Sequence, residues 1–407
     1  MKSWRSNYTA ILIAQTLAIM GFGFSFPIIP FFLEEDIGLT DPARLKFWVG
    51  LIHASAAITL AIFAPIWGHL SDVFSRKLML LRATFCGAIV IGLMSLTTAP
   101  WQLLVLRTLQ GCLTGTVAAS TVLVASISPA AQIAFTLGLL QTGIAVGSSL
   151  GPLVGGVISD FLGYRAAFVG TSILMAIASL IVLKFVHDDF QSSPERKLKK
   201  FSLFPDFKII SGSSILVKMM IVTLVVQAAL SVAAPMIPLY IKELAERAGE
   251  EILMLGSATG MVMGIGAASS ALAAVLVGKF AGRIGFHKSL IFCLSLGAVL
   301  TIPQAFAVNL FQLTVYRALS AFFLGGSMPL INAILAVSSN KQQQGTVFGI
   351  NTSVASAGAA LGPMLGSFVA ILDLRAIFWV SALILGLSVI TLFRGAQVQK
   401  QENYSEE

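Results

Sequence analysis

The sequence predicts an all-α polytopic membrane protein with twelve transmembrane helices in two pseudo-symmetric six-helix halves. Its composition, its charge-poor runs and an internal repeat support this prediction. Of the 407 residues, 57% are hydrophobic and only 11% are charged, whereas charged residues make up about 25% of soluble domains. A chain so poor in charge cannot cover itself with polar surface, so we expect the lipid bilayer to surround it.

Twelve charge-poor runs, bounded by turn or charge signals, are close to or above the length of about 20 apolar residues that crosses a bilayer. The first run is too long for the apolar core of a cleaved signal peptide, so we expect it to remain as the first span. In chain order the expected spans cover residues 9–33, 47–69, 78–98, 101–127, 133–158, 166–186, 215–241, 252–278, 288–307, 310–337, 344–371 and 375–393.

A polar segment separates the sixth span from the seventh. We therefore expect an N-terminal half at 1–186, a cytoplasmic linker at 187–214 and a C-terminal half at 215–407 with a short cytoplasmic tail. With the N-terminus inside, 18 of the 26 lysine and arginine residues are cytoplasmic and six are outside. Because cytoplasmic loops carry the excess of positive charge, we expect a multi-pass protein of the plasma (bacterial inner) membrane with both termini cytoplasmic. The net charge of +8 then reflects orientation, and nucleic acid is not an expected partner.

Three pairs of stretches repeat at nearly one spacing. Residues 26–35 match 234–243 at an offset of 208, residues 101–107 match 311–317 at 210, and residues 150–155 match 361–366 at 211. Two parallel repeats that face each other across a central cavity are an architecture of transporters. The repeat therefore predicts two homologous halves and a transport function.

A charged stretch between the second and third spans is a candidate cytoplasmic gate. An acid flanked by bases can clamp neighbouring helix ends, and a negative charge is stabilised near a helix N-terminus. A weaker copy at 278–288 lacks the acid, so this clamp should be one-sided; a topogenic loop without a gating role is the alternative. The candidate gate residues are Gly68, Asp72, Arg76, Lys77 and Arg82.

Small residues follow one face of the fifth span. Glycines four residues apart let a neighbouring helix approach closely, and a proline inside the span permits a bend. Such a seam suits helices that rock between two states, although ordinary small-residue packing is the alternative. The motif consists of Gly143, Gly147, Gly151, Pro152, Gly155 and Gly156.

These stretches resemble motifs of the major facilitator superfamily, and within it of the twelve-span drug:proton antiporters. Residues 68–77 are similar to the loop motif, with Ser75 where the family usually has Gly; residues 143–156 are similar to the antiporter motif, and residues 20–30 to its Gly then Pro-x-x-Pro signature. The resemblance implies a monomer that exports small amphipathic compounds by alternating access, with protons as a second partner. A dedicated exporter of a metabolite, siderophore or lipid, and a proton-coupled importer, are the alternatives within transport. Outside transport, the alternative is a membrane sensor or scaffold.

Arg107 lies within the fourth span, in a stretch that resembles the family motif in which an intramembrane arginine is linked to proton transfer. A guanidinium at that depth is costly unless it faces water or an acid. We expect it to pair with Glu34 or Glu35 at the outer end of the first span, echoed by Arg317 with Glu243. The alternative is that the acids are solvated and Arg107 extends outward to water.

No span has Asp or Glu near its middle, which departs from many drug antiporters and leaves proton coupling and a preference for cations open. Other polar groups inside spans could line a substrate cavity or form interhelical hydrogen bonds. Besides His53, these are Gln15, Gln110, Gln141, Gln227, Asn332 and Asn351.

The sequence offers no signal for an enzyme, a cofactor or a metal site. Cys86, Cys112 and Cys293 lie inside apolar spans without metal-ligand spacing, and the four histidines are dispersed. No phosphate-binding loop or catalytic cluster appears. A small-molecule substrate is therefore the expected ligand.

Overall fold

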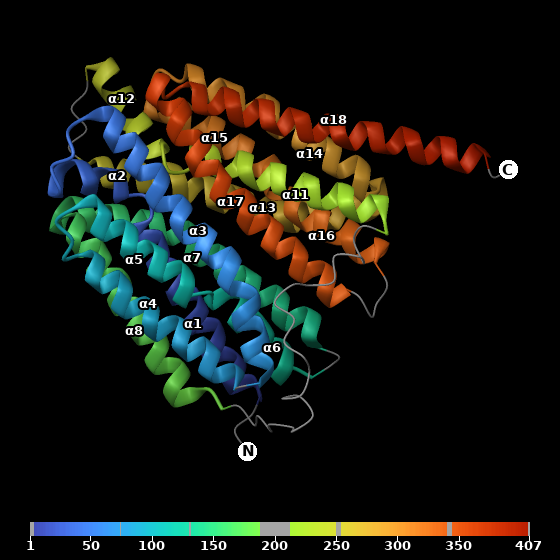
Figure 1. Cartoon of the computed structure of the whole chain (residues 1–407), viewed down its shortest axis with the longest axis horizontal. Helices are drawn as coiled ribbons and strands as arrows, with labels where there is room; N and C mark the ends of the chain where they lie inside the picture. Colours follow the sequence, from blue (N-terminus) through green and yellow to red (C-terminus); the bar gives the residue numbers. More distant parts are fainter. Residues whose placement is uncertain are drawn as a thin grey trace. The chain divides into compact units, whose positions relative to one another are not determined.

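The computed structural model describes residues 4–73, 75–129, 132–187, 212–249, 254–339 and 344–405 (Figure 1). Within these ranges every regular element is a helix. Twelve of the helical stretches there are long and apolar enough to cross a membrane. The predicted all-α fold with twelve spans is confirmed.

The chain divides into two compact units. The first comprises Met1–Leu203 and Glu251–Ala268, and the second comprises Phe204–Glu250 and Ser269–Glu407. The start of the eighth span thus clusters with the first unit, so the predicted division into halves at 1–186 and 215–407 stays a prediction. Most of the predicted linker at 187–214 lies outside the described residues.

The first unit follows the six predicted spans in order. Its helices are α1 (Trp4–Ser25), α2 (Ile29–Phe31), a π-helical turn (Phe32–Asp36), α3 (Pro42–Val73), α4 (Arg76–Met94), α5 (Pro100–Leu113), α6 (Thr116–Ile127), α7 (Ile133–Leu162), α8 (Tyr164–Phe185) and the beginning of α13 (Leu255–Ile284).

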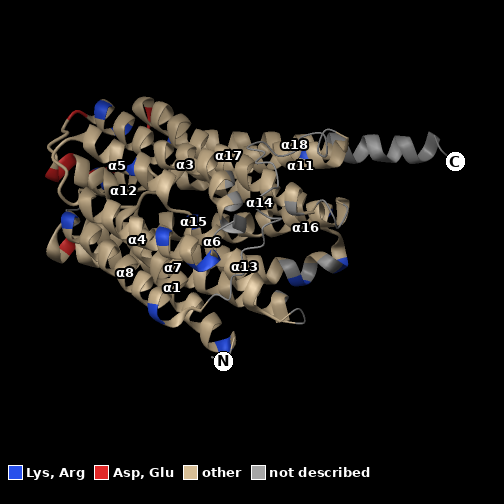
Figure 2. Ribbon diagram, turned by 60° about the horizontal axis from the view of Figure 1, so that its bottom comes forward, with Lys and Arg blue, Asp and Glu red and all other residues tan. Residues whose placement is uncertain are grey.

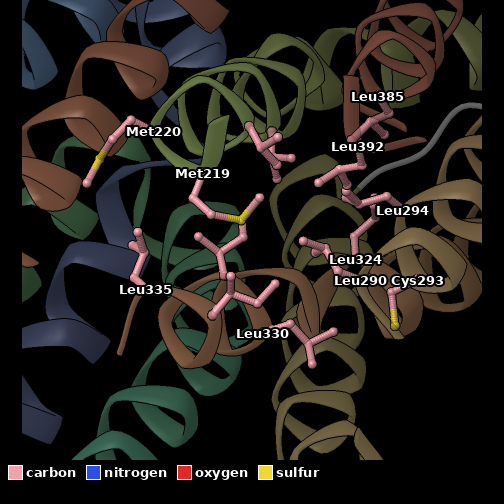
Figure 3. Close-up of a cluster of buried hydrophobic side chains, with 14 of the residues drawn as sticks. Met219, Met220, Leu290, Cys293, Leu294, Leu324, Leu330, Leu335, Leu385 and Leu392 are labelled. Atoms are coloured by element: carbon pink, nitrogen blue, oxygen red, sulfur yellow. The ribbon is translucent and has the colours of Figure 1, made fainter. Parts of the chain in front are cut away.

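The second unit holds the remaining spans. Its helices are α11 (Ser214–Ala233), α12 (Ile237–Ala248), the end of α13, α14 (Phe286–Thr301), a 3₁₀ turn (Ile302–Phe306), α15 (Leu310–Gly325), α16 (Ser327–Ser338), α17 (Gln344–Leu372) and α18 (Ala376–Ser405). Its core joins α11, α14, α15, α16 and α18 through buried apolar side chains, among them Met219, Leu290, Leu324, Leu330 and Leu385 (Figure 3).

Polar caps explain where several helices begin. The Asp41 carboxylate accepts from the backbone N–H of Ala43 at 3.0 Å, directly ahead of α3. The Ser75 hydroxyl accepts from Leu78 at 3.3 Å at the start of α4, and Asn309 accepts from Gln312 at 2.9 Å at the start of α15. Such side chains satisfy backbone donors that a first turn leaves unpaired.

The fourth and tenth spans, predicted as continuous helices, are each broken in two. The first break lies at Gly115, whose φ of +113° is readily accessible only to glycine. The second lies between α15 and α16 at Gly325 and Gly326, one repeat offset of 210 residues later. Both breaks leave carbonyls at a helix C-terminus, where other groups can bind them.

Candidate functional site

The predicted glycine seam of the fifth span packs α7 directly against the backbone of α1. A Cβ added at any of three glycines would collide with a carbonyl of α1, so only glycine permits this approach. Each contact lies one helical turn beyond the last. The pairs are Gly147 with Thr16, Gly151 with Met20, and Gly155 with Phe24.

The second unit repeats this seam between α17 and α11. Its three glycines lie 211 residues after those of α7, and the carbonyls they meet lie 208 residues after those of α1. The offsets equal those of the sequence matches, so the repeat extends to individual backbone contacts. The pairs are Gly358 with Leu224, Gly362 with Ala228, and Gly366 with Val232.

A second face of α7 packs against the first part of α13. Pro152 lies against Gly260, and Gly156, the last residue of the predicted motif, meets Gly256 rather than α1. The Asp160 carboxylate accepts from the backbone N–H groups of Gly256 at 2.8 Å and Ser257 at 2.7 Å. It thereby caps α13 from another helix, a contact that the sequence does not reveal because an acid at the end of a span is ordinary.

The candidate gate contains a stacked Arg82–Trp67 pair at the break after α5. The Arg82 guanidinium lies 3.4 Å from the centroid of the Trp67 ring. The Trp67 indole donates to the Cys112 carbonyl at 2.6 Å, and Arg82 donates to the Thr114 carbonyl at 3.5 Å. Two donors and a positive charge thus bind the carbonyl end of α5, where the helix dipole is negative.

The other gate residues lie around this pair. Arg76 begins α4, and Lys77 donates to the Leu183 carbonyl in the last turn of α8 at 2.9 Å. Gly68 and Asp72 belong to the last part of α3, but the side-chain surroundings of both lie outside the described part of the structure. The role predicted for Asp72 therefore stays a prediction.

The structure does not contain the expected pair of Arg107 with Glu34 or Glu35. Arg107, only 6% exposed, donates to the Gln110 side chain at 2.9 Å. Glu35 accepts from the Tyr164 hydroxyl at 3.2 Å, and Glu34 lies beside it in the π-helical turn. Arg107 finds an acceptor one turn along its own helix, so it does not reach for the glutamates.

The equivalent pair expected in the second unit, Arg317 with Glu243, is also not found. Glu243 pairs with Arg247 one turn later on α12 instead of with Arg317. Acidic residues of the described chain lie at or near helix ends (Figure 2). Glu35 and Glu243 thus bind other partners in this structure, and the roles proposed for these residues in proton coupling stay predictions.

His53 lies within electrostatic reach of Arg107. It is 5% exposed, and its Nδ1 lies 2.8 Å from the Val49 carbonyl. The Phe26 ring packs edge-on against the imidazole at 4.6 Å between centroids. Helices α3 and α5 and the bend after α1 thus bring a titratable group and an arginine together inside the first unit.

Four of the six predicted cavity amides form hydrogen bonds inside the units. Gln15 donates to Thr116 at 3.4 Å, and Gln110 accepts from Arg107. Asn351 donates to Asn332 at 3.0 Å and accepts from Thr223 at 2.8 Å. Gln141 is exposed and Gln227 is half-buried. The interhelical alternative therefore describes Gln15, Asn332 and Asn351.

The two units differ beside their broken helices. An apolar cavity of about 550 Å³ lies in the second unit between Val277, Phe292 and Phe322. In the first unit a cavity of about 70 Å³ lies beside Trp67 and Arg82. The 210-residue offset relates Val277 to Trp67 and Phe292 to Arg82, so these positions hold apolar side chains in the second unit and a stacked aromatic–cation pair in the first. No cluster of metal-ligating residues occurs in the parts that the structure describes.

Comparisons with known proteins agree with this architecture. The family model of the Major Facilitator Superfamily matches residues 11–302 and 219–407. The Multidrug resistance protein MdtG of Proteus mirabilis (strain HI4320) is 31% identical over 389 residues, covering 95% of each chain. The protein of the same name from Enterobacter lignolyticus (strain SCF1) is 32% identical over 383 residues, covering 94% of this chain and 90% of the relative.

Solved structures share the fold at low sequence identity. A bacterial homolog of the human lysosomal transporter Spinster, inward-facing and unoccupied, superimposes with a TM-score of 0.79 at 13% identity and covers 98% of both chains. The nucleoside transporter NupG superimposes with a TM-score of 0.75 at 15% identity, covering 95% of this chain and 97% of that one. Family model, relatives and fold agree, and the chain belongs to the major facilitator superfamily.

Proposed function

We propose that this chain is a secondary active transporter that exports small amphipathic compounds or drugs across the plasma membrane by alternating access, in exchange for protons. The observation that carries the proposal is the two-sided packing of α7. One face meets the backbone of α1 through glycines, and another meets α13 through Pro152 and Gly156. The printed names of the relatives, multidrug resistance proteins, support drugs as the substrate class.

This packing suits alternating access. Backbone surfaces without interlocking side chains can shift past one another with few rotamer changes, and a proline inside α7 removes a hydrogen bond that would resist bending. Helix α7 thus contacts helices on two sides through surfaces of the same kind. A tilt of α7 would alter both seams together.

The orientation in the membrane and the oligomeric state are proposed from the sequence. The excess of basic residues in alternate loops supports a multi-pass inner-membrane protein with both termini cytoplasmic. Alternating access needs a single pair of repeats, so a monomer suffices for transport.

Overexpression in a strain lacking its major efflux pumps tests the export. Raised resistance to several unrelated amphipathic drugs is expected, together with lower cellular accumulation of ethidium. Purified protein in liposomes then tests the coupling, with and without an imposed pH gradient. Ethidium transport that ignores the gradient would contradict proton antiport, and no transport of any drug that the overexpressing strain resists would contradict export itself.

A further inference from the structure

His53 lies inside the membrane-spanning helix α3. It is eleven residues from the start of that helix at Pro42, which is about 16 Å at roughly 1.5 Å per residue. The described spans carry no carboxylate at such a depth, because their acids lie at or near helix ends. An ionisable side chain inside a span marks a functional site more often than a packing position.

The hydrogen bond of the ring assigns its tautomer. A carbonyl oxygen only accepts, so the Nδ1 that lies 2.8 Å from the Val49 carbonyl carries the hydrogen. In the neutral ring Nε2 is then the basic nitrogen. This atom is buried and has no hydrogen-bond partner, which makes it an acceptor left open for a proton.

The surroundings of Nε2 suit the protonated ring. The backbone carbonyl of Phe26, at the bend between α1 and α2, also lies close to the imidazole. An imidazolium donates from both nitrogens, so Val49 and Phe26 would each accept one of its hydrogens. Protonation would thus supply the bond that Nε2 lacks in the neutral ring.

Burial is the larger obstacle to this protonation, and Arg107 is the second. It is the charged group of the described chain that acts on His53, and two buried positive charges side by side repel. Other charges next to α3 lie toward its ends: the acids Glu34 to Asp36 in the π-helical turn, and Arg82 on α4 beside the end of α5. Helix α6 carries none. His53 can therefore hold a proton only when Arg107 has left its present place beside Gln110.

We propose that His53 carries the exchanged proton and that the position of Arg107 decides when it binds. This inference rests on the proposed function. A proton from the outer water adds to Nε2 while Arg107 lies away from the ring. It leaves to the cytoplasmic water when Arg107 returns to the site beside Gln110. The arrangement in which Arg107 lies away from the ring then favours proton binding to His53. By thermodynamic linkage, a proton bound to His53 favours that arrangement to the same extent.

The test compares His53→Gln with wild type in liposomes, using ethidium as the probe. Glutamine keeps an amide that can hydrogen-bond in the site but cannot carry a proton. Gradient-driven ethidium transport should fall by about tenfold or more, within the roughly 5–150-fold range of linked sites. Ethidium exchange at equal pH on both sides, which needs no net proton movement, should stay within about twofold of wild type, since direct substrate contacts are unaltered.

His287→Gln is the matched control, because His287 lies on α14 in the second unit and should keep its coupling. Gradient-driven transport that persists in His53→Gln would overturn the inference while leaving antiport intact. Wild-type transport that ignores the gradient would overturn both. A second measurement needs no substrate: magnetic resonance of protein labelled at its four histidines should show more protonated His53 in Arg107→Gln than in wild type at about pH 6. Equal protonation in the two proteins would contradict the role of Arg107.

Discussion

At the scale of single residues, Arg82 shows how a broken helix is held. The break at Gly115 exposes the carbonyl end of α5, and Arg82 reaches the Thr114 carbonyl while stacked on Trp67. A planar guanidinium can stack on a ring and donate in its own plane at the same time, which an ammonium cannot. The sequence placed Arg82 in a gate motif but gave no sign of this partner, since the break itself was not predicted.

We expect Arg82→Ala to lower the free energy of unfolding by about 1–3 kcal/mol, from the lost stacking and the unpaired carbonyl. Arg82→Lys should recover only part of it, because the charge remains and the planar stack does not. Thermal unfolding of purified protein in detergent measures both. Arg283→Ala, at an exposed position on α13, is the control and should leave the melting temperature unchanged. Equal melting temperatures for wild type and Arg82→Ala would show that the stack contributes nothing.

At the scale of helices, the seams of α7 depend on the absence of side chains. The Cβ of Gly155→Ala would collide with the backbone of Phe24, which has no rotamer to change. Overpacking of this kind costs about 1–3 kcal/mol, so we expect lower stability and a loss of drug resistance. Growth assays and melting temperatures measure the two effects.

Gly138→Ala is the matched control on the same helix, because a Cβ there meets nothing within 4 Å. Alanine favours helix over glycine by up to about 1 kcal/mol, so this variant should be at least as stable as wild type. If both variants lost resistance alike, the loss would reflect helix propensity or expression and not the seam.

The contact of Asp160 with α13 gives a local prediction. Asparagine has one side-chain oxygen where aspartate has two, so Asp160→Asn should free one of the N–H groups of Gly256 and Ser257 and cost about 0.5–2 kcal/mol. Hydrogen exchange at the start of α13 should become faster. Asp41→Asn, which alters a cap within α3 itself, should leave that exchange unchanged. Unaltered exchange in Asp160→Asn would mean that the cap does not hold the end of α13.

The sequence predicted the helices better than it predicted which side chains contact one another. All twelve spans were found, because a long apolar run has no alternative to a helix inside a bilayer. The break at Gly115 was missed, since glycine is tolerated within membrane helices as well as at their ends. The partner of Arg107 was missed for another reason: the guanidinium can reach acceptors on its own helix or on neighbours, and only packing decides between them.

At the scale of the whole molecule, the repeat was visible in sequence and recurs in backbone contacts. The seam of Gly155 with Phe24 and that of Gly366 with Val232 are equivalent within each unit. The repeat has diverged where the units hold different side chains beside the broken helix, at Arg82 and Phe292. The two units therefore share a fold and differ in individual side chains, and the proposed role of His53 beside Arg107 would be one such difference.

The orientation of the chain is the remaining property of the whole molecule, and it can be tested directly. Replacing the three native cysteines and adding single ones reports which side each loop faces. Thr40→Cys and Thr98→Cys lie in exposed turns on the expected outer side, so a membrane-impermeant maleimide should label both in intact spheroplasts. Ser405→Cys, at the end of α18, should react only after the membrane is opened. Labelling of Ser405→Cys in intact cells would reverse the topology, and it would place the 18 basic residues outside, against the charge rule from which the orientation was argued.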